Sequence, residues 1–366
     1  MEAYRPKKIF LEKSVAHLPL ARRLLQALPG IPVQEIADLR DFKSPEPMTE
    51  AKRLLYIAQY RGEALKPFPK VKYAFNLGDY VFNPISNCHL ECRYCILQSY
   101  LKNNPGLTVF ANLDHFFKAI EKKIKESDQT FLRMGTGELS DSLALDDLTR
   151  LSQDLVPFFA KQKKAFLELK TKSNRIDHLL NLDHRGQTVI SVSLSPEKIV
   201  REEELKCASL AERLVAAKSL QDRGYAVGLH LDPLIYFKGW EESYRDLVES
   251  ISQNINPKRL AWLSLGSLRF DPDLKKEAQE RFPKTKIFSG DFLLGEDKKY
   301  RYFKKIRLSM YQKILAYLRD YSTDFPRYLC MEAPWVWEEV MGEAPSVEAF
   351  EEKLGKRLQA LAKESF

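Results

Sequence analysis

Three of the five cysteines in this chain stand close together. Cys88, Cys92 and Cys95 have the spacing C-x3-C-x2-C, whereas Cys207 and Cys330 are isolated. A cubane 4Fe–4S cluster has four irons and is normally held by thiolates, so three cysteines would leave one iron open to an exogenous ligand. A zinc site of three cysteines and one remote histidine uses the same residue types. An odd, clustered cysteine count favours such metal ligation over a disulfide framework.

Short β-rich runs alternate with amphipathic helices through the centre of the chain and would position this triplet. The predicted strands cover 80–85, 130–134, 165–169, 188–194, 226–231 and 260–265. Apolar residues recur at helical spacing within three of the connections, 116–124, 210–220 and 240–251. Such alternation is typical of parallel strands with right-handed crossovers. It predicts an α/β fold, and six units suit a partial or full (β/α) barrel better than a doubly wound sheet.

The two ends of the chain differ from this alternating centre. We expect residues 1–70 to form an N-terminal appendage, which includes a helix over 18–28. Residues 71–270 would form the barrel. Residues 271–366 would form a C-terminal region that begins with basic and aromatic residues and closes with a helix over 350–361.

Polar residues stand at the ends of most predicted strands. They include Glu138, Lys172, Ser193, Ser195 and Asp232. In a barrel these ends converge on one rim, which is where barrel enzymes place their chemistry. We therefore expect the cysteine triplet and these polar residues to share one site.

The cysteine triplet, placed in the loop after the first predicted strand, resembles the motif of the radical SAM superfamily. In that superfamily the open iron chelates S-adenosylmethionine through its amino and carboxylate groups. An ordered set of short matches narrows the resemblance to the spore photoproduct lyase family of DNA-repair enzymes. The matching pieces are Cys88–Gln98, Ser140–Asp141 with Leu145–Thr149, Lys170–Lys172 with Ile176–Leu180, and Pro233–Tyr236 with Gly239–Glu241. The aromatic Tyr94 and the barrel pattern favour the cluster over zinc.

The resemblance implies a partial (β/α)6 radical SAM barrel and a role for each matching residue. Cys88, Cys92 and Cys95 would hold a 4Fe–4S cluster. Tyr94 would pack against S-adenosylmethionine, and a set of polar side chains would surround that cofactor: Ser140, Lys172, Ser193, Ser195 and Asp232. A lysine and hydroxyls suit the cofactor's carboxylate, and polar atoms of the rim suit its ribose.

The chain departs from the family at the hydrogen donor. The lyases carry a hydrogen-donating cysteine two residues before the Ser-Asp pair, where this chain has Glu138. They often carry a tyrosine just after the last cluster cysteine, where this chain has Ile96. The run Gly135–Glu138 instead resembles the Gly-Gly-Glu element with which many radical SAM proteins hold the amino group of the cofactor. We therefore assign Glu138 to cofactor binding.

The lyase reaction that the resemblance implies ends with the transfer of a hydrogen atom to the thymine radical. Without the family's cysteine, three sources of that atom remain: Tyr94, Cys330, and return from 5′-deoxyadenosine. A thiol S–H bond is weak, and Cys330 follows the basic region, from which a chain returning to the rim would bring it close. Cys207 precedes a predicted helix over 208–222. We therefore expect Cys207 to lie on the outer ring of helices, away from the rim.

The chain is moderately basic, with 58 Lys and Arg against 50 Asp and Glu. Residues 297–320 carry eight basic and two acidic residues with five aromatics among them. This pattern fits binding to a nucleic-acid backbone, although a run of charges is more often a solvated face. In the lyases a basic β-hairpin occupies this region and probes the lesion. The resemblance implies DNA contacts from Lys298, Lys299, Arg301, Tyr302, Lys304, Lys305 and Arg307.

We thus expect a radical SAM lyase that repairs a thymine-dimer lesion in DNA and takes electrons from a flavodoxin- or ferredoxin-type donor. Two alternatives stay open: an enzyme of the same fold with another nucleic-acid or nucleoside substrate, and a non-catalytic nucleic-acid-binding protein with a structural metal centre. The sequence has no run of about 18 uncharged apolar residues and no apolar N-terminal segment. We therefore expect a cytoplasmic protein without membrane contact, and a monomer.

Overall fold

The computed structural model describes residues 1–42, 47–68, 74–75, 77–101 and 106–363. Its largest element, here called the main sheet, has eight strands in the order β18-β14-β13-β11-β10-β9-β5-β4. Their bounds are β4 Lys66–Pro67, β5 Tyr80–Val81, β9 Leu132–Gly135, β10 Ala165–Thr171, β11 Thr188–Ser193, β13 Ala226–Leu234, β14 Leu260–Ser267 and β18 Arg327–Leu329. All neighbours are parallel except β4 and β5. Because β4 and β18 remain as edges, the sheet is an open, partial barrel, and the prediction of a partial α/β barrel is confirmed.

The central strands are buried along almost their whole length. β11 is buried at every residue and β14 at every residue except its last. Near-continuous burial is what parallel strands show when both faces of the sheet are covered. The predicted strand over 80–85 is shorter than expected: β5 ends at Val81, and Ile85–Ser86 forms β6 in a different sheet. Pro84, which has no N–H to give to a ladder, separates the two.

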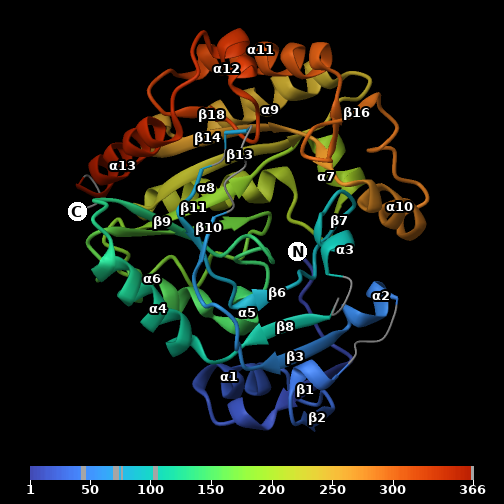
Figure 1. Cartoon of the computed structure of the whole chain (residues 1–366), viewed down its shortest axis with the longest axis vertical. Helices are drawn as coiled ribbons and strands as arrows, with labels where there is room; N and C mark the ends of the chain where they lie inside the picture. Colours follow the sequence, from blue (N-terminus) through green and yellow to red (C-terminus); the bar gives the residue numbers. More distant parts are fainter. Residues whose placement is uncertain (43–46, 69–73, 76, 102–105, 364–366) are drawn as a thin grey trace.

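Helices join the strands and cover the main sheet (Figure 1). The three predicted helical stripes fall within α4 (Leu113–Glu126), α8 (Leu210–Asp222) and α9 (Trp240–Asn254). α8 begins with a capping box in which Ser209 and Glu212 bond to each other's backbone N–H groups. The remaining helices are α1 Pro19–Ala27, α2 Met48–Ala51, α3 Leu97–Tyr100, α5 Asp146–Thr149, α6 Leu151–Phe159, α7 Glu197–Glu203, α10 Pro272–Arg281, α11 Lys304–Tyr321, α12 Pro334–Met341 and α13 Val347–Lys363.

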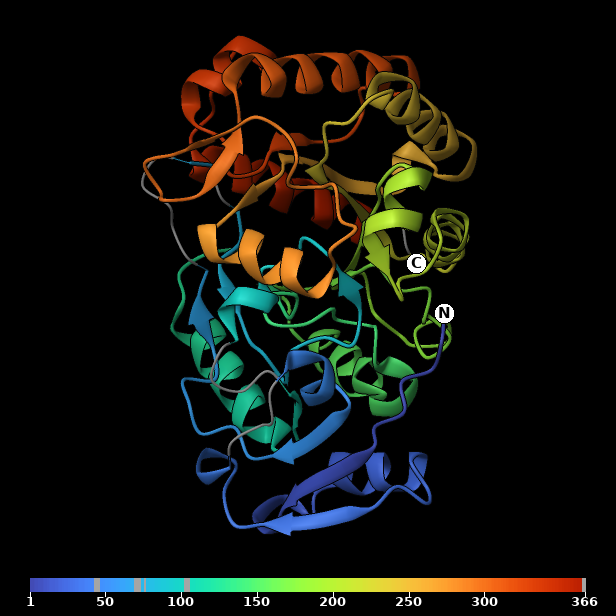
Figure 2. The same ribbon diagram turned by 90° about the vertical axis from the view of Figure 1, so that its right-hand side faces the viewer.

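A second sheet, here called the N-terminal sheet, lies at the blue end of the molecule (Figures 1 and 2). Its order is β2-β1-β3-β8-β6, with β1 Lys8–Glu12, β2 Val33–Ile36, β3 Leu54–Ala58 and β8 Leu107–Phe110. β1, β2, β3 and β8 run parallel, and β6 is antiparallel to β8. The sheet therefore takes β6 and β8 from beyond the 1–70 segment, and the predicted boundary at 70–71 lies outside the described residues.

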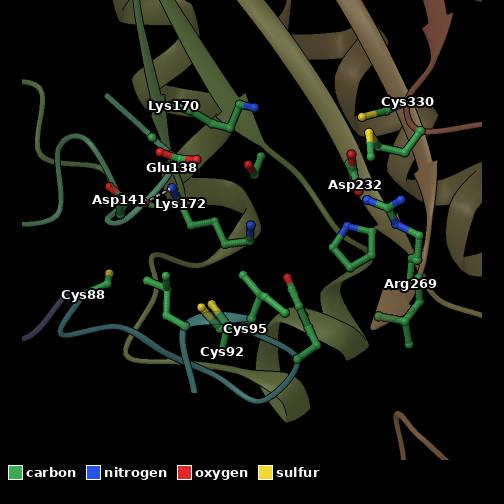
Figure 3. A pocket seen from close by; sticks show the side chains of 18 of the residues that line it. Cys88, Cys92, Cys95, Glu138, Asp141, Lys170, Lys172, Asp232, Arg269 and Cys330 are labelled. Atoms are coloured by element: carbon green, nitrogen blue, oxygen red, sulfur yellow. Dashed lines mark hydrogen bonds between the residues drawn. The ribbon is translucent and has the colours of Figure 1, made fainter. Parts of the chain in front are cut away.

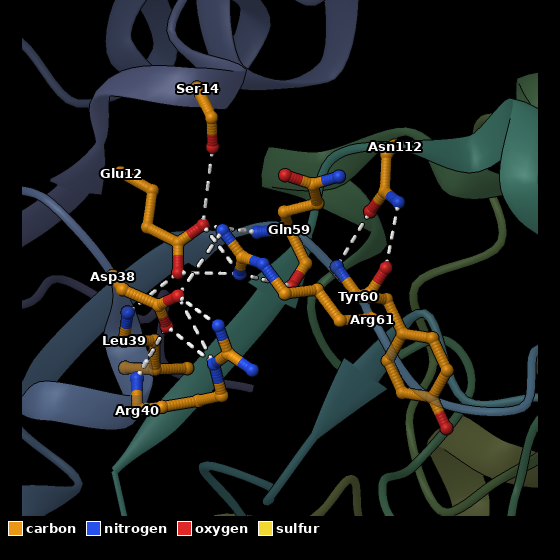
Figure 4. Close-up of polar contacts among 9 residues, drawn as sticks. All are labelled: Glu12, Ser14, Asp38, Leu39, Arg40, Gln59, Tyr60, Arg61 and Asn112. Carbon is orange, nitrogen blue, oxygen red and sulfur yellow. Dashed lines mark hydrogen bonds and ion pairs between the residues drawn. The ribbon is translucent and has the colours of Figure 1, made fainter.

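A fully buried carboxylate holds together the carboxyl ends of the strands of the N-terminal sheet (Figure 4). Glu12, at the end of β1, accepts hydrogen bonds from the backbone N–H of Leu39 at 2.6 Å and of Gln59 at 2.9 Å. Arg61 Nη1 donates to both oxygens of Glu12 at 3.0 Å, and its Nη2 lies 3.6 Å from Asp38. The polar groups at this edge thus satisfy one another.

The C-terminal region packs helices and a small sheet beside the main sheet. β15 (Arg269–Phe270), β17 (Tyr300–Tyr302) and β16 (Phe292–Leu294) form an antiparallel sheet, and α11 follows directly. The basic segment 297–320 is therefore the second strand of a hairpin joined to a helix. The predicted closing helix is α13, which buries the expected apolar face. Within the described ranges, no helix has the length and apolar character needed to span a bilayer.

Candidate active site

A cavity of about 340 Å³ opens at the carboxyl ends of the main sheet (Figure 3). Its walls come from the cysteine loop, from the loop after β9 and from the ends of β10, β11, β13, β14 and β18. Most of the residues predicted from the sequence line it: Cys88, Cys92, Tyr94, Cys95, Glu138, Ser140, Lys172, Ser193, Asp232, Arg301, Arg307 and Cys330. Parallel strands bring these residues together because their carboxyl ends share one edge.

The three cysteines of the triplet border the cavity on one side. Cys88 lies apart from Cys92 and Cys95 (Figure 3), and in the described part of the chain no three His, Cys, Asp or Glu side chains are gathered into a metal-binding group. The donor set nevertheless fits a cluster: three thiols face one cavity, and no histidine is among the described residues that line it. A three-cysteine, one-histidine zinc site is therefore less well matched than a thiolate-held 4Fe–4S cluster.

The cysteine loop is fixed by a short strand pair. β7 (Glu91–Cys92) pairs antiparallel with β12 (Glu204–Leu205), so that Glu204 lies opposite Cys92. Gln98 donates to the carbonyl oxygens of Cys92 and Arg93 at 3.1 and 3.0 Å. The protein's own backbone and amide groups therefore hold the loop in place.

The expectation for Cys207 is wrong. Its Sγ lies 3.4 Å from Cys92 Sγ, beneath the cysteine loop rather than on the outer ring. The cause is the pairing of β12 with β7, which brings the turn before α8 under the triplet. Cys207 does not line the cavity in the part of the chain described, so it lies behind Cys92.

Glu204 is a site residue that the sequence did not indicate. Tyr94 donates its hydroxyl to Glu204 Oε1, Ser195 Oγ donates to the same oxygen at 2.8 Å, and Arg213 Nη2 lies 2.6 Å from Oε2. Burial alone would raise the pKa of Glu204, but Arg213 and Lys172 outweigh burial and lower it. The carboxylate is therefore charged and holds Tyr94 at the cavity wall.

The same network explains where two predicted residues lie. Ser195 is bonded behind the wall, to Glu204, and does not border the cavity in the described residues. Lys172 does border it, with Nζ 5.7 Å from the centre of the Tyr94 ring. Burial is the largest influence and opposes the charge of Lys172, but Glu204, Cys92 and Cys207 together outweigh it, so the pKa of Lys172 is raised and the ammonium persists.

The loop after β9 is held by Asp141. Its carboxylate accepts from Thr171 Oγ1 at 2.7 Å and from the Lys172 N–H at 2.6 Å, which ties the loop to the end of β10. Asn83 Nδ2 donates to Glu138 Oε2 at 2.9 Å and leaves the other carboxylate oxygen available. Gly137 allows the close approach, because a Cβ there would lie 3.0 Å from Lys170 Cβ.

Asp232 and Cys330 lie together on the opposite wall from the triplet (Figure 3). Both residues line the cavity, and burial together with the neighbouring Asp232 carboxylate raises the pKa of the Cys330 thiol. Gly266 on β14 makes room for this carboxylate, because a Cβ at that position would lie 2.6 Å from Asp232 Cγ.

Three comparisons with known proteins agree. The family model described as spore photoproduct lyase matches residues 4–315. The chain belongs to the spore photoproduct lyase family. Spore photoproduct lyase of Geobacillus sp. is 25% identical over 78% of this chain and 85% of its own length, and that of Bacillus subtilis is 23% identical over 77% and 84%. A solved spore photoproduct lyase complexed with dinucleoside spore photoproduct aligns with 90% of this chain and 100% of its own, at 23% identity and a TM-score of 0.79.

The family and the fold predicted from the sequence are therefore confirmed. In this member of the spore photoproduct lyase family, Glu138 and Ile96 both line the cavity at the positions where the sequence departs from the family pattern. The departure thus lies within the cavity itself.

The basic segment that the spore photoproduct lyase resemblance assigned to DNA is only partly exposed. Arg301 pairs with Asp297 at 2.6 Å, and the buried Arg307 pairs with Glu332. Tyr302 is buried, and its hydroxyl accepts from the Tyr236 N–H at 3.1 Å. The four lysines of this segment differ in exposure and in ion pairing. Lys304 pairs with Glu339 at 2.9 Å, Lys299 is half-buried, and Lys298 and Lys305 are exposed.

Proposed function

We propose that this chain is a radical SAM lyase that repairs the spore photoproduct, a thymine-dimer lesion in DNA. One observation carries the proposal: a single cavity gathers the cysteine triplet and the polar residues of the motif, in a chain that matches the lyase family over residues 4–315. The DNA-repair activity and substrate follow from that family. A flavodoxin- or ferredoxin-type protein would supply the electrons.

The chain's own residues divide the cofactor-binding work between two walls. Cys88, Cys92 and Cys95 would hold the 4Fe–4S cluster, and the charged Lys172 and the free oxygen of Glu138 would bind the carboxylate and amino groups of S-adenosylmethionine. When bound and reduced, the cluster and this cofactor supply a 5′-deoxyadenosyl radical. Cofactor and substrate bound in this cavity would limit the access of water to such a radical.

The remaining wall would receive the lesion. Arg269 and Arg301 border the cavity, and both pair with Asp297, at 2.9 and 2.6 Å. Two guanidinium groups that share one carboxylate retain positive charge for a phosphate. The exposed Lys298 and Lys305, on the same hairpin and helix, would contact the DNA backbone outside.

A product assay tests the proposal. The protein, reconstituted with iron and sulfide without oxygen, is incubated with dithionite, S-adenosylmethionine and the dinucleoside spore photoproduct. We expect two restored thymidines, and no restored thymidine with the Cys88→Ala variant. Formation of 5′-deoxyadenosine with the lesion left intact would contradict the proposal.

A second candidate function has one specific observation in its favour. The carboxylate of Glu138 and the aliphatic Ile96 line the cavity where the lyases carry a cysteine and a tyrosine. An enzyme of the same fold acting on another nucleic-acid or nucleoside substrate would fit this change. Cofactor cleavage that depends on DNA or RNA but not on the lesion would favour this candidate.

A further inference from the structure

The cavity wall that faces the cysteine triplet carries one more thiol, that of Cys330 (Figure 3). Its backbone is held on both sides: the Cys330 N–H donates to the Leu265 carbonyl at 2.7 Å, and the Met331 N–H donates to the Phe75 carbonyl at 2.7 Å. The first bond extends the pairing of β18 with β14. The thiol is therefore presented from a rigid strand end rather than from a free loop.

The proposed lyase reaction needs a hydrogen atom at its end. Removal of hydrogen from C6 of the dihydrothymine lets the bond between the bases break, which leaves a C5=C6 double bond in one base and a CH2 radical on the other. That radical becomes a methyl group only when it gains a hydrogen atom. Carboxyl and aliphatic hydroxyl groups hold hydrogen strongly and exchange it as a proton, whereas thiol S–H and phenol O–H bonds are weak.

The cavity offers few groups with such a hydrogen. Glu138 and Ile96 have none to give, and the Tyr94 hydroxyl is bonded to Glu204. Of the lining residues in the described ranges, Cys330 is the only thiol outside the cluster triplet.

We propose that Cys330 is the catalytic hydrogen-atom donor of this enzyme, a role that rests on the proposed lyase function. The Cys330 S–H bond breaks as the methyl C–H bond forms, so the substrate radical is reduced and the sulfur becomes a thiyl radical. The thiyl radical returns to the thiol by taking one electron from the low-potential protein electron donor and one proton from solvent. Hydrogen atoms and electrons then balance over the turnover.

The surroundings of Cys330 suit this role. Burial and the neighbouring Asp232 carboxylate raise the pKa of the thiol, so the sulfur carries its hydrogen at neutral pH. The thiol lies across the cavity from Cys88, Cys92 and Cys95, which leaves the space between them for the substrate (Figure 3). A donor placed on the far side meets the product radical without displacing the cofactor.

Solvent deuterium tests the donor. In D2O the thiol becomes S–D, so the unaltered protein should place one deuterium in the restored methyl group. Cys330→Ala and Cys330→Ser should consume the lesion but lose this label and give adducts of the trapped radical. Cys207→Ala removes a thiol that does not line the cavity in the described part of the chain and should keep the label.

Two further readouts keep the proposal falsifiable. Binding of the dinucleoside lesion to the cluster-free variants should be unchanged, since the alanine removes only a hydrogen donor. Unchanged labelling in Cys330→Ala would overturn the donor role, as would a parallel loss of label and of lesion binding. An intact lesion with the unaltered protein would overturn the lyase function and this role with it.

Discussion

The main sheet and the N-terminal sheet both place polar residues at the carboxyl ends of parallel strands, but with opposite outcomes. In the N-terminal sheet, Glu12 accepts hydrogen bonds from two backbone N–H groups and from Arg61 (Figure 4). The polar groups at this edge therefore bond to one another and not to a ligand. In the main sheet, Lys172 and Asp232 border a cavity of about 340 Å³ (Figure 3).

This difference shows what separates a structural polar edge from a functional one. A buried carboxylate that has protein donors for its oxygens stabilises the fold and has no capacity left for a ligand. A polar group beside a cavity keeps that capacity, and water or a ligand fills it. Chemistry is therefore expected at the main sheet alone, and the two edges should respond differently to substitution.

The cysteine triplet should give the largest effect. Anaerobic reconstitution of the unaltered protein should yield about four irons per chain, and Cys88→Ala, Cys92→Ala or Cys95→Ala should lose nearly all of them. Cys207→Ala is the matched control, because its sulfur lies 3.4 Å from Cys92 Sγ yet does not border the cavity within the described residues. Iron analysis and visible absorption measure this. Stoichiometric zinc without iron uptake would refute the cluster.

Glu12 should matter for stability and not for the cofactor. Glu12→Ala leaves the Leu39 and Gln59 N–H groups and Arg61 without their acceptor, so we expect the free energy of unfolding to fall by about 4 kcal/mol. Asp232→Asn, at the open edge, should change it by less than about 1 kcal/mol. Urea unfolding of both variants checks this. Equal destabilisation would erase the contrast between the two edges.

His230 should make the main sheet sensitive to acid. Burial, together with Lys170, lowers the pKa of His230 to about 4, although Glu168 and Asp232 oppose this shift. The unfolded chain binds the proton near pH 6.5. Between these two pKa values the unfolded state holds more protons than the folded state, so the free energy of unfolding falls as the pH is lowered. At pH 5 it should be about 2 kcal/mol lower than at a pH well above 6.5.

The variant His230→Gln isolates this effect. The loss of unfolding free energy between pH 7.5 and pH 5 should be smaller in this variant, whereas His17→Gln, at an exposed position, should leave it unchanged. Urea unfolding at the two pH values measures the difference. An identical pH dependence in all three proteins would show that His230 does not titrate as proposed.

The exposed lysines beside the cavity should give the smallest effect. Lys298→Ala with Lys305→Ala should weaken DNA binding and reduce the slope of log affinity against log salt by about 0.9 for each phosphate that is no longer neutralised. Lys122→Ala with Lys125→Ala removes the same charge from α4, far from the hairpin (Figure 1), and should leave the slope unchanged. Equal slopes in both double variants would remove Lys298 and Lys305 from the interface.

Much of the fold and part of the site could be predicted from the sequence. β-rich runs and helical stripes are local signals, so they predict the six strands and helices α4, α8 and α9. The cysteine triplet is also a local signal, because the spacing of its three cysteines is enough to predict that they bind a cluster. The short β5 was overestimated, because Pro84 divides that run between two sheets.

Long-range pairing of short elements could not be predicted. β7 and β12 have two residues each, yet their pairing places Cys207 and Glu204 at the cysteine loop. Glu204 stands in a run of acidic residues, which is typical of a solvated helix face. Its ion-pair partner, Arg213, lies within α8. The sequence likewise suggests that Arg307 is a free cation. In the structure it is buried and forms an ion pair with Glu332.

The measurement that tests the central claim most directly follows one deuterium atom. The reconstituted protein is given S-adenosylmethionine, dithionite and a dinucleoside spore photoproduct carrying deuterium at C6 of its dihydrothymine. If the cavity of the main sheet performs the proposed repair, mass spectrometry should find that deuterium on the 5′ carbon of 5′-deoxyadenosine, together with two restored thymidines. Unlabelled 5′-deoxyadenosine beside an intact lesion would contradict it.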